Sequence, residues 1–183
     1  MKVLKWILIS LAAIVLLLFI AFKWMQSNTK KLSPEGSVSF KTEQFDVEMN
    51  YSRPSVRGRT IFGDLVPYGE VWRTGANEPT TFTTDTDLKV NGEVLPAGTY
   101  TLWTIPGPEQ WQFIFNSKSY PWGVGWDGEV MREADYDVLS TTVYREATPN
   151  IIETLSISLV EIPNGFQMQL AWESTLLRMD FTK

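Results

Sequence analysis

Hydrophobic residues follow two different patterns along the chain, an uninterrupted run near the N-terminus and an alternation with polar residues afterwards. The run, WILISLAAIVLLLFIAF between Lys5 and Lys23, contains seventeen uncharged residues. As a helix it would extend roughly 25 Å, enough to cross a bilayer when the flanking lysines reach the interface. Trp6 and Trp24 lie at its two ends, where interfacial aromatic residues are typical. The run therefore predicts a transmembrane helix within residues 1–25.

A cleaved signal peptide is the competing interpretation, because Met1–Lys5 is also a typical charged start of such a peptide. No small-x-small cleavage pattern follows the run, and the sequence has no cysteine that could carry a lipid. We therefore expect an uncleaved signal anchor. Lysines lie on both sides of the run, so the positive-inside rule hardly distinguishes the two possible orientations in the membrane. The short N-terminal tail favours the orientation in which the N-terminus stays in the cytoplasm. This predicts a single-pass membrane protein whose C-terminal domain is exported.

The polar segment 26–36, QSNTKKLSPEG, has the composition of a linker, and the alternating pattern begins after it. Residues 37–183 are expected to form one domain. Its clearest alternation is FQMQLAW, in which Phe166, Met168, Leu170 and Trp172 share one face. Further strands are expected over residues 37–40, 45–51, 80–84, 100–105, 111–115, 137–145, 155–159 and 176–182.

Turn residues support the same interpretation. Asn91-Gly92 and Asn164-Gly165 each separate two strand-like runs, and both pairs suit tight hairpin turns that need positive φ. After the N-terminal run, no stretch of ten residues has a convincing amphipathic helical pattern. The sequence therefore predicts an all-β fold, an antiparallel β-sandwich that is possibly jelly-roll-like, preceded by one N-terminal transmembrane helix.

Charge and composition exclude several classes of function. Five of the 16 basic residues fall within the first 31 residues, which leaves 11 basic against 21 acidic residues in the rest of the chain. This excess of about ten negative charges argues against nucleic acid or another polyanion as a partner. The chain has no His and no Cys, so it can form no disulfide, no Ser-His-Asp triad, no thiol nucleophile and no His/Cys metal site. We expect no cofactor and no metal.

Carboxylate chemistry survives this exclusion. Asp64, Glu70 and Glu78 lie near several tryptophans in the sequence, so a carboxylate-dependent hydrolase acting on carbohydrate is an alternative function. The run DGEVMREADYD, residues 127–137, has enough acids for a calcium site, but its spacing does not match an EF-hand loop. A solvated acidic connection between strands is the simpler interpretation of that run.

The tryptophans divide into two groups. Trp111 and Trp172 share strand faces with Phe and Leu, so we expect them in the core. Trp122 and Trp126 lie among glycines in PWGVGWDG, where they are candidates for the rim of an apolar or sugar site. A loop folded over a sheet edge would have the same composition.

The loop PYGEVWRTGANEPTTF, residues 67–82, contains the remaining candidate ligand-binding residues, which are Trp72, Arg73, Asn77 and Glu78. Alternation places Val71 and Arg73 on one side and Trp72 on the other. We expect Arg73 to brace the loop from inside by pairing with Glu78 or Asp64, and Trp72 or Asn77 to face the outside or a cleft.

The same loop carries a family resemblance. VPYGEVWRTGANE, together with VNGEVLPAGTYTLWTIPG and WQFIFN, resembles the bacterial family labelled domain of unknown function 2911, over most of residues 37–183. The resemblance implies a secreted or envelope protein with a single domain, and it implies no established activity or catalytic residue.

With the resemblance, these observations predict a binding or envelope-interaction module anchored in the bacterial inner membrane, with its C-terminal domain in the periplasm. It would recognise a small molecule or another envelope protein, and binding is favoured over enzymatic activity. The hydrolase is one alternative, and a structural subunit of an envelope assembly is another. A structural subunit would have no cleft and would carry an exposed apolar patch large enough for a partner.

Overall fold

The computed structural model describes residues 2–125 and 127–183, which form two units, one up to Leu32 and one from Ser33 to Lys183. The first unit is a single helix, α1 (Lys2–Leu32). Residues 3–32 of α1 have a mean hydropathy of 2.8 in their most apolar window, and the helix is long and apolar enough to cross a membrane. Segment 26–36, expected as a linker, is helical up to Leu32 and enters the first strand at Glu35.

The second unit is built on an antiparallel sheet. Its strands within the described residues are β1 (Glu35–Lys41), β2 (Asp46–Ser52), β3 (Thr81–Thr84), β4 (Leu88–Val90), β5 (Glu93–Leu95), β6 (Gly98–Ile105), β7 (Gln110–Asn116), β8 (Asp137–Ile162) and β9 (Gly165–Thr182). The nine strands pair in the order β1-β2-β3-β6-β7-β8-β9-β4-β5, so the sheet is open and β1 and β5 are its edges. A short 3₁₀ helix, Ala134–Tyr136, precedes β8. The predicted strands are confirmed, and the helix-free interpretation of the domain agrees with this element list.

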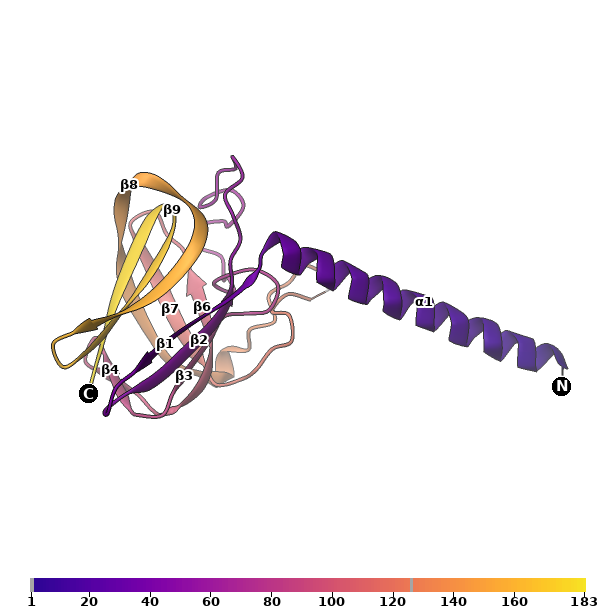
Figure 1. Ribbon diagram of the computed structural model, residues 1–183, viewed down its shortest axis with the longest axis horizontal. Coiled ribbons are helices and arrows are strands. Elements are labelled where there is room, and N and C mark those ends of the chain that lie inside the picture. The colour runs from indigo at the N-terminus through magenta and orange to yellow at the C-terminus, as the bar shows by residue number, and fades with distance from the viewer. Residues whose placement is uncertain (1, 126) are drawn as a thin grey trace. The chain divides into compact units, whose positions relative to one another are not determined.

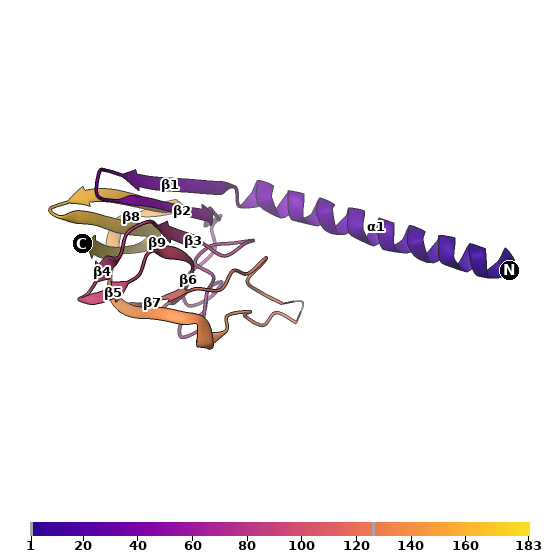
Figure 2. The same cartoon turned by 90° about the horizontal axis from the view of Figure 1, so that it is seen from below.

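β8 and β9 are each longer than the alternating pattern predicts, because each joins two predicted strands. β8 continues from residue 137 through 162, although the segment between the predicted strands 137–145 and 155–159 contains Pro149 and Asn150. The register of β8 against β9 shifts between Ala147 and Ile152 and again before Ser156, so irregular pairing accommodates these residues. Figures 1 and 2 show β8 curving as it leaves β7 to pair with β9.

The sheet curls, so that β1 and β3 face β9 across one hydrophobic core. Phe82 of β3 stacks on Phe181 of β9 with ring centroids 5.2 Å apart, and Phe40 of β1 contacts Phe166 of β9 at 5.1 Å. The predicted face of β9 is confirmed, since its four apolar residues between 166 and 172 are almost fully buried. Trp111 and Trp172 are also buried in this core, as expected.

A second, smaller cluster lies on the other face of β6 and β7. Trp103 of β6 and Ile114 of β7 are opposite each other in the register, and Tyr120 packs edge-on against Trp103 at 5.3 Å. Val71, from the long connection between β2 and β3, packs on this cluster. Irregular segments therefore cover the outside of the sheet here, and they position the candidate site.

The two predicted hairpins both form, with one difference in detail. Asn91 (φ 51°) and Gly92 (φ 86°) are the two residues between β4 and β5, as predicted. In the β8–β9 hairpin the turn residues are Pro163 and Asn164 (φ 65°), and Gly165 already pairs with Ile162. Gly165 is needed for a different reason, because a Cβ at this position would lie 1.9 Å from the carbonyl oxygen of Phe181.

Candidate functional site

The connection between β2 and β3 contains the loop that the sequence singled out, and its side chains alternate as predicted. Val71 and Arg73 point towards the cluster around Trp103. Trp72 points the other way and packs in the main core, where it stacks on Trp172 with ring centroids 6.0 Å apart. Its indole N–H donates to the carbonyl oxygen of Gly75 at 3.0 Å. We expected Arg73 to point inwards and Trp72 to point outwards. The structure shows the reverse, because the main core lies on the Trp72 side of the loop.

Arg73 is half-buried and holds two loops together. Its Nη1 donates to the carbonyl oxygen of Trp122 at 3.1 Å. Gly123 (φ 82°) brings the second loop so close that a Cβ there would lie 2.7 Å from Pro79 and 3.3 Å from the Arg73 side chain. Burial lowers the pKa of the Arg73 guanidinium, and the negative field of Glu78 acts in the opposite direction. Arg73 thus links the two loops through the Trp122 carbonyl, whereas the expected brace was an ion pair with Glu78 or Asp64. Of these two acids, Glu78 is the one that acts on the Arg73 charge.

Buried polar groups fix the end of the loop that carries Glu78. Thr74 is fully buried at φ 55°, an unfavourable conformation for a β-branched residue, and its carbonyl accepts the Thr80 hydroxyl at 2.7 Å. Asn77 (φ 59°) is also buried and donates from Nδ2 to the carbonyl oxygen of Ser33 at 3.2 Å. The expectation that Trp72 or Asn77 faces the outside or a cleft is therefore wrong: one packs in the core, and the other ties the loop to the chain just before β1.

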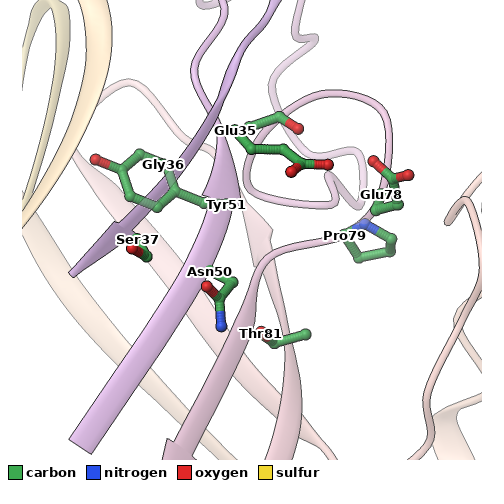
Figure 3. A pocket seen from close by; sticks show the side chains of 9 residues that line it. Glu35, Gly36, Ser37, Asn50, Tyr51, Glu78, Pro79 and Thr81 are labelled. Carbon is green, nitrogen blue, oxygen red and sulfur yellow. The ribbon is translucent and has the colours of Figure 1, made fainter. Parts of the chain in front are cut away.

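Glu78 lines a cavity of about 400 Å³ next to this loop. The cavity is lined by residues of β1 and β2, by the start of β3 and by the loop before β3, namely Glu35, Gly36, Ser37, Asn50, Tyr51, Ser52, Glu78, Pro79 and Thr81. Figure 3 shows the carboxylates of Glu35 and Glu78 at the same end of the cavity, with Asn50 and Thr81 further along. Most of the lining thus comes from paired strands.

Strand register explains why polar groups gather there. Glu35 is opposite Ser52, Ser37 is opposite Asn50, and Asn50 is opposite Thr81, so these side chains share the outer face of the sheet. Apolar side chains of the same strands, such as Met49 and Phe82, share the core face.

Ser52 is the most enclosed polar residue of this set. It is 2% exposed and forms part of the cavity wall, where its hydroxyl can donate or accept a hydrogen bond.

The cavity has a negative character. Glu35 and Glu78 are the charged residues among the described residues that line it, and both interact with other groups of the chain. No lysine or arginine is in that lining, and the positive charge of Arg73 acts on Glu78 from outside it. The side chain of Arg53 lies close to Gly36, but its Nε donates to the carbonyl oxygen of Leu155 in β8 at 3.3 Å. A carboxylate pair attracts cations, and the attraction is stronger in a partly enclosed site than in bulk water.

Sequence reasoning found Glu78 but missed Glu35. Glu35 lies within segment 26–36, for which the sequence predicts a linker, although its spacing from Ser37 and Ser39 already follows the alternation of the strand. The alternation therefore extended two residues further towards the N-terminus than the predicted strand.

The other candidates lie elsewhere. Asp64 and Glu70 are exposed and outside the cavity, so the acids proposed for hydrolysis do not gather in it. Trp122 is half-buried and contributes its carbonyl to Arg73, and Trp126 lies outside the described residues.

Acids of the run 127–137 form ion pairs with basic residues of the domain. Asp137 pairs with Arg132, and Glu133 pairs with Lys118. Within the described residues, no group of three or more acids is placed to hold a metal ion.

Comparison with known proteins identifies the second unit. A family model described as "Protein of unknown function (DUF2911)" matches residues 33–181, which is nearly all of that unit. This confirms the resemblance seen in the loop sequence and in LPAGTY. The chain matches no curated protein and no solved structure.

Proposed function

We propose that this chain, which belongs to the DUF2911 family of proteins of unknown function over residues 33–181, is a membrane-anchored binding module that takes a small cationic molecule into the cavity beside Glu35 and Glu78. In this proposal α1 is an uncleaved anchor in the bacterial inner membrane, and the domain functions in the periplasm as a β-sandwich. The shared core of β3 and β9 supports the sandwich description, because side chains from distant parts of the sheet face each other across it.

The hydrophobicity of α1 supports the anchor. Its apolar side chains are exposed along the whole helix, for example Leu17 at 65% and Phe19 at 55%, and they require an apolar environment such as lipid. We expect the intact mass of the protein extracted from membranes to include residues 1–25. A mature N-terminus near residue 25 would show a cleaved signal peptide instead.

The observation that carries the binding proposal is the composition of the cavity wall. Two carboxylates, an amide and several hydroxyls line one cavity whose volume lies within the range of ligand sites, and the lining contains no positive charge. The strands that carry most of these groups are paired in the sheet, and hydrogen bonds of Asn77 and Thr80 fix the loop that carries Glu78. A preorganised site of this kind binds without ordering its own side chains first, which lowers the cost of association.

The ligand class follows from this wall. A primary or secondary ammonium group can donate hydrogen bonds to the carboxylates, and the rest of the ligand can hydrogen-bond to Asn50, Ser52 and Thr81. Small amines therefore fit the cavity better than acids or apolar molecules of the same size.

A set of compounds with matched length tests this function. We suggest measuring the melting temperature of the full chain in polyoxyethylene detergent with putrescine, 1,4-butanediol or succinate, and with spermidine and agmatine as further amines. We expect at least one amine to raise the melting temperature in a saturable way, because a ligand that binds the folded state stabilises it. Butanediol and succinate should have no effect.

Glu35→Gln and Glu78→Gln should each weaken amine binding about tenfold, the loss expected for one charge-assisted hydrogen bond. Glu93→Gln on β5 is the matched control, since Glu93 is exposed and outside the cavity lining. The proposal is wrong if no amine binds, if succinate binds as well as putrescine, or if the three variants behave alike.

A further inference from the structure

A second hollow lies at the other end of the same loop. Its volume is about 820 Å³, and it is bordered by Tyr68 and Gly69 of the loop, by the turn between β6 and β7, and by Tyr144 of β8. The loop thus contributes Tyr68 to this hollow and Glu78 to the cavity described above. The hollow shares no lining residue with that cavity, so the two are separate sites.

Two tyrosine rings are held in solvent at this hollow. Tyr144 is 73% exposed although it lies in the middle of a paired strand, opposite Gln110 of β7. Tyr68 is 43% exposed, and its ring lies against Gly63, where a Cβ would be 2.7 Å from Cε2 of the ring. The Gly69 N–H donates to the carbonyl oxygen of Pro106 at 2.8 Å and fixes the loop to the β6–β7 turn. Two exposed aromatic rings beside one hollow offer flat surfaces on which a ligand can stack.

The wall between the rings is polar and nearly neutral. Gln110 and Gln112 alternate with the buried Trp111, so both amides share the outer face of β7. Thr142 of β8 is opposite Gln112 on that face. Glu109 is the one charged residue among the described residues that line the hollow.

This combination selects for an uncharged polyhydroxylated ligand. The flat C–H face of a sugar ring packs on a tyrosine ring, and side-chain amides both donate to and accept from neighbouring hydroxyls. The domain carries an excess of about ten negative charges, which repels anionic polymers. A proline-rich peptide also binds aromatic surfaces, but its recognition uses aromatic-lined grooves, whereas amides and a hydroxyl line much of this wall.

We propose that the hollow between Tyr68 and Tyr144 is a binding site for a neutral glycan chain. The two rings stack on sugar rings, and Gln110, Gln112 and Thr142 hydrogen-bond to the sugar hydroxyls. This inference is independent of the amine cavity, because it depends on different residues.

Calorimetric titration of the full chain tests the proposal, in a polyoxyethylene detergent because maltoside detergents carry sugar. The probes are cellohexaose, chitohexaose and maltohexaose as neutral glycans, hexagalacturonate as an anionic one, and decaproline as a peptide. We expect at least one neutral hexasaccharide to bind and hexagalacturonate and decaproline not to bind.

Variants locate the binding surface. Tyr144→Ala should weaken glycan binding about three- to tenfold, the value of one aromatic contact, and Tyr144→Phe should retain it because the ring remains. Tyr136→Ala is the control, since Tyr136 is also exposed, at 45%, but lies outside the hollow. Gly63→Ala should also weaken binding, because the new methyl group displaces the Tyr68 ring.

The fold is not at risk in the Tyr144 variants, because this side chain is largely exposed. Absence of binding by all three neutral hexasaccharides would overturn the proposal. Binding that Tyr144→Ala and Gly63→Ala leave unchanged would also overturn it, as would decaproline binding that depends on Tyr144, which would identify the hollow as a peptide groove.

Discussion

Arg73→Ala tests whether the guanidinium braces the two loops that lie beside the candidate site. The substitution removes the hydrogen bond from Nη1 to the Trp122 carbonyl and the aliphatic stem that packs near Pro79 and Gly123. A hydrogen bond from a charged donor contributes about 1.5–3 kcal/mol. We take the lower value, about 1.5 kcal/mol, for the lost hydrogen bond. Arg73 is only half-buried, and its removal also removes the cost of desolvating its charge, which lowers its pKa.

The stem adds a packing contribution. Three methylene groups at about 0.8 kcal/mol each, halved for partial exposure, give about 1 kcal/mol. The total loss of stability is therefore about 2.5 kcal/mol, which corresponds to a fall in melting temperature of about 5–10 °C for a domain of this size. Tryptophan fluorescence during heating of the full chain in detergent measures this fall.

Arg73→Met separates the two contributions, because it keeps an unbranched apolar side chain and removes the hydrogen bond. We expect it to lose about half as much stability as Arg73→Ala. If Arg73→Ala melts like the parent protein, the guanidinium is not a brace, and the argument from burial and the Trp122 contact is refuted.

Three further predictions concern the fold. Gly92→Val should cost about 1–2 kcal/mol in urea unfolding, because Gly92 has φ 86° and open space around it, so the backbone alone resists the substitution. Gly165→Ala should cost more than about 3 kcal/mol, because the new methyl group would collide with the backbone carbonyl of Phe181, and a stable variant would contradict this close approach. Burial raises the pKa of the Tyr100 hydroxyl. The stability that the neutral hydroxyl contributes is therefore complete below the unfolded-state pKa, about 10, and is lost as the pH rises through the folded-state pKa. Tyr100→Phe should reduce this loss of stability in thermal melts above about pH 10.

The sheet was predictable from the sequence where one face of a strand is buried and the other is not. β9 is the clearest example, since its buried residues alternate with half-exposed glutamines. The full length of β8 was not predictable, because Pro149 and Asn150 are typical of a loop and only the irregular register with β9 accommodates them.

The site was predictable only in part. Alternation correctly separated Arg73 from Trp72, but Val71 and Trp72 are both apolar, so the sequence did not show which side faces the main core. Glu35 was missed because its partner in the site, Glu78, is 43 residues away, and the two reach one cavity only because β1 pairs with β2 and β2 pairs with β3. Such long-range proximity is a property of the folded sheet and not of any local sequence pattern.

A crystal structure of the full chain with the amine that stabilises it most tests the central claim most directly. The proposed function predicts an ammonium nitrogen in the cavity, at about 2.7–3.2 Å from a carboxylate oxygen of Glu35 or Glu78. An amine bound elsewhere on the domain, with this cavity filled by water alone, would contradict it.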